Sequence, residues 1–375
     1  MVTGFLSRVL LGVELGFCSW EVILTVLIRS LEFVVLSAHL MLTIRVDLKC
    51  EQSLTVLLLL ASTNDYVKGI FMRVVTRSDM DGLVCAVLLK EVENIDEISF
   101  VHPKDIQDGK VEITKKDILT NIPYDPRCGM WFDHHSSEAT RTENIKDFKG
   151  AIEIAPSAAR VIYNYYGGNE KLKRFEKLLI DVDAIDSANL TMEDITNPTG
   201  WILLGFVLDS RTGLGKYQNF KISNYQLMMN MTDWIGRHDV KEILEFEDVK
   251  ERTEMYFKHN EEFSNHLKIC SRLEKNVLIT DQRNFEEVPT GNRFSIYTLF
   301  PTCNVSMRIF WGFKKQNIVC AVGHNIFNRD CNTNVGELMS QYGGGGHKGA
   351  GTCQLEIEGA DTKLKQIAER MQNNG

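Results

Sequence analysis

From residue 72 onward, the chain alternates short apolar runs with longer stretches of helical periodicity. The runs at 73–76, 98–102, 118–121 and 130–132 are predicted to be strands, and those at 83–92, 156–166 and 170–185 to be helices. Pro156 suits a first helical turn, and Gly167-Gly168 suits a helix stop. Strands that alternate with helices are typical of a parallel sheet covered by helices.

The second half of the chain has a different pattern. Residues 200–272 are predicted to be mostly helical, and the charged run at 239–272 has the length of a connecting helix pair. Strands are then expected at 277–280, 294–300, 305–311, 318–323 and 352–357, with a helix at 335–342, a glycine loop and a final helix. We therefore predict an α/β domain at 72–235 and a smaller α/β domain at 276–375. A helical linker at 236–275 would join them and allow closure over a substrate.

The first 71 residues do not match this pattern. Residues 22–44 are apolar, yet they contain Arg29, Glu32 and His39, each of which is costly at the centre of a bilayer. A signal peptide has a basic region, a short apolar core and a cleavage site in that order, and this segment does not show that order. Met72 directly precedes the first predicted strand. We expect 1–71 to be an extension upstream of the functional protein, with a membrane-surface or partner-binding segment as the alternative.

Composition narrows the class of protein. The chain has 375 residues, of which 44% are hydrophobic and 25% are charged, as expected for two globular domains. A net charge of −8 argues against non-specific binding of duplex DNA, but it permits a small phosphorylated substrate in a focused pocket. Nine cysteines without a CxxC pair indicate buried thiols in a reducing, cytoplasmic protein. A homodimer is compatible with these data.

Two acidic motifs carry the chemistry. The sequence RSDMDG at 77–82 places Asp79 and Asp81 where the first strand meets the first helix, and Gly82 relieves crowding at that turn. Ligands bind at the carboxyl ends of parallel strands, although either acid could instead cap the helix. The second motif, Asp133-His134-His135, follows another apolar strand. Oxygen and imidazole ligands together suit Mn²⁺ and tolerate Mg²⁺ or Zn²⁺.

The triplet Asp133-His134-His135 resembles the signature of the DHH phosphoesterase superfamily. That superfamily includes RecJ-type exonucleases, family II inorganic pyrophosphatases, oligoribonucleases and cyclic-dinucleotide phosphodiesterases. The resemblance implies another acid at the end of the strand at 118–121, where Asn121 stands, and one within 181–186. We favour Asp186 for the latter, with Asp183 as the alternative.

A glycine run at 343–346, followed by His347 and Lys348, resembles the phosphate-binding signature of the DHHA1 domain that accompanies this family. Glycines allow backbone N–H groups to converge on an anion. The segment Ser306-Met307-Arg308 is similar to the family's second basic contact. The expected substrate-binding residues are therefore Ser306, Arg308, Gly344, Gly345, Gly346 and His347.

Two positions depart from the family pattern. Arg77 stands where the family usually has a metal-binding histidine, and Asn121 stands at the bridging aspartate, although Asp117 is near in sequence. An arginine cannot ligate a cation, so the first of the family's two metal positions lacks a ligand here. We therefore expect one or two Mn²⁺ (or Mg²⁺) ions. The implied metal ligands are Asp79, Asp81, Asp133, His134 and Asp186, and the implied catalytic groups are His135, Arg77 and Asp133.

These residues predict a metal-dependent phosphoesterase that acts on a short oligonucleotide, a linear or cyclic dinucleotide, or a polyphosphate. Within the superfamily, the pattern is most similar to the group called exopolyphosphatase-related. Two alternatives stay open: a catalytically degenerate phosphate or nucleotide sensor, and a single-strand exonuclease. The exonuclease would use aromatic residues for stacking, for which Phe310, Trp311 and Phe313 are candidates.

Overall fold

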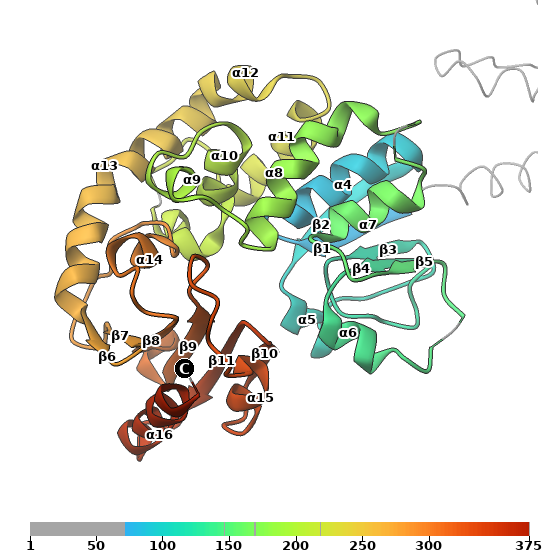
Figure 1. Ribbon diagram of the computed structural model, residues 1–375. Helices are drawn as coiled ribbons and strands as arrows, with labels where there is room; N and C mark the ends of the chain where they lie inside the picture. Colours follow the sequence, from blue (N-terminus) through green and yellow to red (C-terminus); the bar gives the residue numbers. More distant parts are fainter. Residues whose placement is uncertain (1–71, 146, 169, 218, 375) are drawn as a thin grey trace, which may run out of the picture. The chain divides into compact units, whose positions relative to one another are not determined.

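The computed structural model describes residues 72–374 except 146, 169 and 218 (Figure 1). These residues belong to one compact unit. The predictions made for residues 1–71 lie outside the described part of the chain. Among the described residues, no helix combines the length and the apolar character needed to cross a bilayer.

The first sheet has five parallel strands in the order β2-β1-β3-β4-β5. Their bounds are β1 (Met72–Arg77), β2 (Ile95–Val101), β3 (Asp117–Thr120), β4 (Met130–Asp133) and β5 (Gly150–Ile152). On one face, Val74, Ile118 and Phe132 pack in the core that includes α4 (Met80–Val92), α7 (Ala158–Tyr165) and α8 (Glu176–Asp186). On the other face, Val75, Leu119 and Trp131 pack with Ile106 of α5 (Pro103–Gln107). Because both faces are covered, the inner strands β3 and β4 are buried at every position.

A helical region follows this sheet. It comprises α9 (Met192–Thr196), α10 (Gly200–Leu208), α11 (Asn224–Trp234), α12 (Val240–Glu245) and α13 (Glu247–Cys270). Figure 1 shows α13 running from these helices to the second sheet. The helix is charged overall, but it buries Val249, Tyr256, Phe263 and Leu267 along one stripe. The helix pair predicted at 239–272 is confirmed as α12 and α13.

The second sheet has six strands in the order β10-β11-β9-β8-β7-β6, and only β7 and β8 pair in parallel. The strands are β6 (Ser271–Glu274), β7 (Val277–Asp281), β8 (Val305–Trp311), β9 (Ile318–His324), β10 (Gly345–His347) and β11 (Ala350–Leu355). Val305, Met307 and Ile309 of β8 are buried in the core with α15 (Val335–Ser340) and α16 (Ala360–Asn373). Because side chains alternate along a strand, Ser306 and Arg308 point to the opposite face. The predicted fold class, a parallel-sheet α/β part followed by a smaller α/β part, is confirmed.

Three local predictions were wrong. Residues 294–300 do not form a strand but contain a helix, α14 (Ser295–Leu299), because a short apolar run fits a buried helix as well as a strand. Pro156 lies before α7, whose N-cap is Ser157 with its hydroxyl accepting from Arg160 N at 3.0 Å. The glycine run is partly a strand, β10, in register with β11. The described cysteines are all buried and free of disulfides.

Candidate metal centre and substrate cavity

The candidate site lies at the carboxyl edge of the first sheet. Arg77 ends β1, Asn121 follows β3, and Asp133 ends β4. Gly82 is required at this edge, because a Cβ there would lie 2.1 Å from the carbonyl oxygen of Arg77. The two sequence motifs therefore meet in space, as parallel strands dictate.

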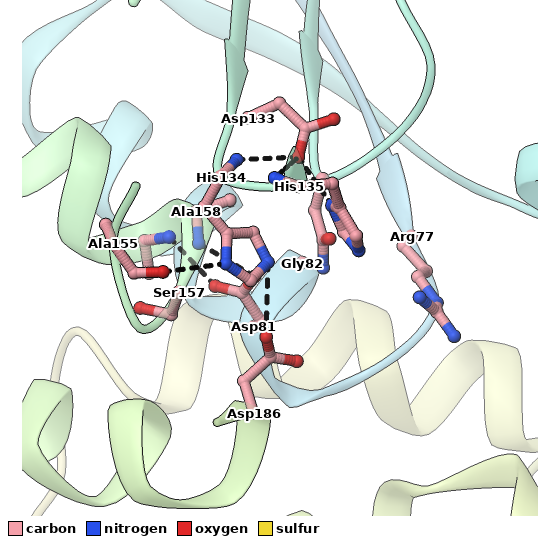
Figure 2. Close-up of polar contacts among 12 residues, drawn as sticks. Arg77, Asp81, Gly82, Asp133, His134, His135, Ala155, Ser157, Ala158 and Asp186 are labelled. Atoms are coloured by element: carbon pink, nitrogen blue, oxygen red, sulfur yellow. Dashed lines mark hydrogen bonds and ion pairs between the residues drawn. The ribbon is translucent and has the colours of Figure 1, made fainter. Parts of the chain in front are cut away.

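Three ligand-type side chains from three elements form one cluster (Figure 2). His134 Nε2 lies 3.2 Å from an Asp186 carboxylate oxygen and 3.8 Å from Asp81 Oδ2. One oxygen from each acid and one ring nitrogen lie within 4.8 Å of one another. Asp81 comes from the first turn of α4, His134 follows β4, and Asp186 is the last residue of α8.

Backbone groups hold two members of this cluster. The His134 Nδ1 atom lies 3.1 Å from the carbonyl oxygen of Ala155, which leaves Nε2 directed at the acids. Asp81 accepts hydrogen bonds from the N–H groups of Ala158 and Ala159, at 3.0 and 2.8 Å, at the start of α7. Such contacts orient metal ligands in proteins.

The cluster fits a divalent cation. Asp81 is 2% exposed, and burial together with the facing Asp186 raises the pKa of Asp81 to about 7. His134 Nε2 is buried and faces only these two carboxylates among the described residues. Two adjacent carboxylates, of which Asp81 is fully buried and Asp186 partly buried, are unfavourable without a compensating charge. A cation between them would satisfy both acids and the imidazole, and this ligand set suits Mn²⁺ or Mg²⁺.

Asp183, the alternative to Asp186 as a metal ligand, instead binds Arg160 and Ser157. Its carboxylate accepts from Arg160 Nη2 at 2.6 Å, from Arg160 Nε at 2.8 Å and from the Ser157 hydroxyl at 2.6 Å. Asp117 is also remote from the site, because it begins β3 and pairs with Arg73 Nε at 2.7 Å. It cannot replace the missing bridging acid.

Asp79 has partners that do not belong to the cluster. It is the N-cap of α4, accepting from Gly82 N at 3.0 Å, and Arg77 Nε lies 2.9 Å from its other oxygen. The Asn121 side-chain amide also donates to Asp79, at 3.2 Å. Asn121 itself has a left-handed backbone, with φ of 55°. The guanidinium of Arg77 therefore supplies the positive charge next to Asp79.

Asp133 organises the histidine pair. One oxygen of this fully buried carboxylate accepts from the N–H groups of His134 and His135, at 2.7 and 3.1 Å, and lies 2.6 Å from His135 Nδ1 (Figure 2). Its second oxygen is buried without a partner among the described residues. Burial opposes protonation, yet the Asp133 carboxylate raises the pKa of His135 above its ordinary value. The His135 ring also stacks on His347, with centroids 5.1 Å apart.

A cavity of about 810 Å³ joins this cluster to the second sheet. Of the residues predicted to bind substrate, Ser306, Arg308 and His347 line it. Gly344, Gly345 and Gly346 do not line it, although Gly349 and Gly351 do. Strands β10 and β11, which the turn after the glycines joins, instead pack closely: a Cβ on Gly346 would lie 2.2 Å from the oxygen of Ala350. The glycines thus allow β10 to hold His347 against His135.

Sequence reasoning missed two groups of cavity residues. Arg211 and Arg293 line the cavity from turns that precede and follow α13, and no family motif marks them. Phe263 and Leu267 of α13 also line it, where the helical stripe could have indicated burial but not contact with a ligand site.

Comparisons with known proteins place these features in a family. No protein-family model matches the chain, and no curated protein sequence does. Among solved structures, the pGpG-specific phosphodiesterase PggH from Vibrio cholerae is 48% identical, with a TM-score of 0.69. The match covers 81% of this chain and all of PggH. The chain belongs to the DHH family of phosphoesterases.

More distant structures also match this DHH phosphoesterase. The DHH domain of a member of the S1p family of ribosomal proteins is 11% identical, with a TM-score of 0.48, over 86% of this chain and 92% of that one. RecJ from Thermus thermophilus in complex with Mg²⁺ is 13% identical, with a TM-score of 0.44, over 81% of this chain and 50% of that one. Neither is similar enough to assign residues. Family membership makes the chain a hydrolase that acts on phosphoester bonds.

Proposed function

We propose that this DHH phosphoesterase hydrolyses the phosphodiester bond of a short linear dinucleotide of the pGpG type, assisted by one Mn²⁺ ion. The 48% identity to PggH over the full length of that enzyme carries the proposal. The cluster of Asp81, His134 and Asp186 beside a cavity large enough for a nucleotide supports it. The reaction adds water across the central diester, so pGpG gives two molecules of GMP.

Asp81, His134 and Asp186 would hold the ion. When bound, a divalent cation lowers the pKa of a coordinated water and polarises the phosphoryl oxygens. His135 has its Nδ1 atom on Asp133, so its Nε2 atom is available to a phosphate oxygen or to a transferred proton. Arg77 lines the cavity and would contribute positive charge near that phosphate.

The second sheet would hold the far nucleotide. Arg308 donates to Gln282 Oε1 at 2.6 Å and has no carboxylate partner among the described residues, so an anionic ligand would compensate its charge. Ser306 and His347 lie on the same cavity wall. We also propose that residues 72–235 and 276–375 form two domains, and that these domains close over the substrate by movement about the helices between them.

The test uses the full chain with Mn²⁺ and four substrates: pGpG, cyclic di-GMP, a short single-stranded RNA and tripolyphosphate. We expect rapid conversion of pGpG to GMP, measured by chromatography, and much slower turnover of the others. Tight binding of both Mn²⁺ and pGpG without phosphodiester cleavage would instead support the sensor alternative. Preferred degradation of the longer RNA would support the exonuclease.

We expect one metal ion per chain, because the Arg77 guanidinium occupies the side of Asp79 that a second cation would need. The double variant Arg77→His, Asn121→Asp supplies an imidazole and a carboxylate there. We expect Mn²⁺ stoichiometry, measured by elemental analysis after gel filtration, to rise from about one towards two. Arg77→Gln removes the charge without adding a ligand of this kind, and it should stay near one. Two ions in the unmodified chain, or no increase in the double variant, would contradict the one-metal account.

A further inference from the structure

The turn sequence Asp-x-Arg occurs three times with the same local geometry. In Asp125-Pro126-Arg127, Asp209-Ser210-Arg211 and Asp281-Gln282-Arg283, the acid accepts from both the backbone N–H and the Nε of the arginine two residues later. The motif is therefore a structural turn in itself. Any further role must come from what distinguishes one copy from the other two.

The three copies differ in charge. Within the described part of the chain, Arg127 forms an ion pair with Asp125 alone, so that pair is neutral. Arg283 lies between Asp281 and Asp361, which leaves one excess negative charge. Asp209, by contrast, binds two guanidinium groups, those of Arg211 and Arg293. Only the Asp209 copy carries an excess positive charge.

The Asp209 copy is also the only one of the three whose arginines line the cavity. The Asp209 side chain is 9% exposed, whereas those of Arg211 and Arg293 are 47% and 25% exposed. The backbone N–H of Gly291 donates to the Thr212 carbonyl at 3.0 Å and ties the two supporting turns together. The arginines are thus fixed on a buried acid, with their remaining N–H groups available to the cavity.

Two adjacent guanidinium groups that share one carboxylate are mutually repulsive. Burial and the neighbouring Arg211 lower the pKa of Arg293 to about 10, despite the attraction of Asp209. A bound anion would relieve this repulsion. Guanidinium groups match the geometry of phosphate oxygens, and two of them suit a dianionic phosphate better than a diester with one charge.

We propose that Arg211 and Arg293, held by Asp209, bind the terminal phosphate monoester of a linear dinucleotide and so select for it. The inference rests on the proposed function for the substrate class. The central diester already has the metal cluster, His135 and Arg77 beside it. The terminal phosphate is the substrate group that remains, and both GpG and cyclic dinucleotides lack it.

The test compares pGpG with GpG, which differ only in this phosphate. Binding of each is measured by calorimetry to the full chain in EDTA, so that the result does not depend on turnover, and kcat/KM is then measured with Mn²⁺. We expect the unmodified chain to bind pGpG at least tenfold more tightly than GpG. Arg211→Ala and Arg293→Ala should lose roughly 10- to 100-fold in pGpG affinity and most of that preference.

Arg127→Ala is the matched control, because it removes an arginine from the same turn motif outside the cavity. It should keep the full preference for pGpG. Arg211→Lys and Arg293→Lys retain the charge and should show an intermediate preference, which keeps the test valid if an alanine variant unfolds. Three results would overturn the inference: no preference for pGpG in the unmodified chain, an equal loss of affinity for pGpG and GpG in the variants, or a preference that survives in all four variants of Arg211 and Arg293. Failure to cleave pGpG would contradict the proposed function but leave the binding test decisive.

Discussion

Replacing His134 by alanine is expected to remove Mn²⁺ binding and to lower kcat/KM by roughly a thousandfold or more. The imidazole is the group that lies between the two acids, 3.2 Å from Asp186 and 3.8 Å from Asp81. Without it, the two remaining carboxylates can hold a cation only weakly. Metal content after gel filtration and hydrolysis of pGpG at saturating Mn²⁺ would measure both effects.

His238→Ala provides the control for this variant. His238 pairs with Glu242 at 3.3 Å on the partly exposed surface of the helical region, so its loss should change neither metal content nor rate. The melting temperature of both variants should be measured without metal. It should change little, because His134 makes few contacts other than those with Ala155 and the acids. Full retention of metal and activity in His134→Ala would rule out the proposed cluster.

Asp133→Asn is expected to keep one Mn²⁺ ion but to lower kcat by about 100-fold or more. The Asp133 carboxylate receives three N–H contacts at one oxygen and fixes the His135 ring through Nδ1. An amide has the same shape but no negative charge, so it would no longer favour protonated His135. The orienting role predicts a change in kcat with little change in metal stoichiometry.

Asp117→Asn is the matched control for that substitution. Asp117 is 1% exposed and Asp133 is fully buried, and both belong to adjacent strands of the same sheet. Asp117 pairs with Arg73 at the opposite end of its strand, so its replacement should reduce stability but not the kcat of the folded protein. If Asp133→Asn instead released the metal, Asp133 would be a ligand rather than an orienting group.

Periodicity predicted most of the fold because burial on both faces leaves a clear apolar signal. The strands that form the centre of each sheet and helix α4 are found where the pattern placed them. The failures have physical causes. The three-residue strand β5 is too short to show a period, and the run at 294–300 is too short for its two polar residues, Ser295 and Thr298, to separate a helix from a strand.

The chemistry of the site was predictable where it follows a strand end, and less so where it depends on long-range packing. The sequence contained three aspartates within α8, but only the structure separates Asp183, which binds Arg160, from Asp186, which faces His134. The pairing of Asp79 with Arg77 was equally hidden, because side-chain pairing cannot be read from spacing, whereas the role of Asp79 as the N-cap of α4 was an alternative that the sequence had left open. Arg211 and Arg293 are 82 residues apart in the sequence, so no local pattern joins them.

The most direct measurement of the central claim is the position of the metal. Crystals of the full chain grown with Mn²⁺ would show its anomalous scattering. We predict one strong peak within coordination distance of Asp81, His134 and Asp186, and none between Arg77 and Asp79. A peak remote from His134, or no peak at this cluster at a Mn²⁺ concentration that supports hydrolysis, would contradict the account.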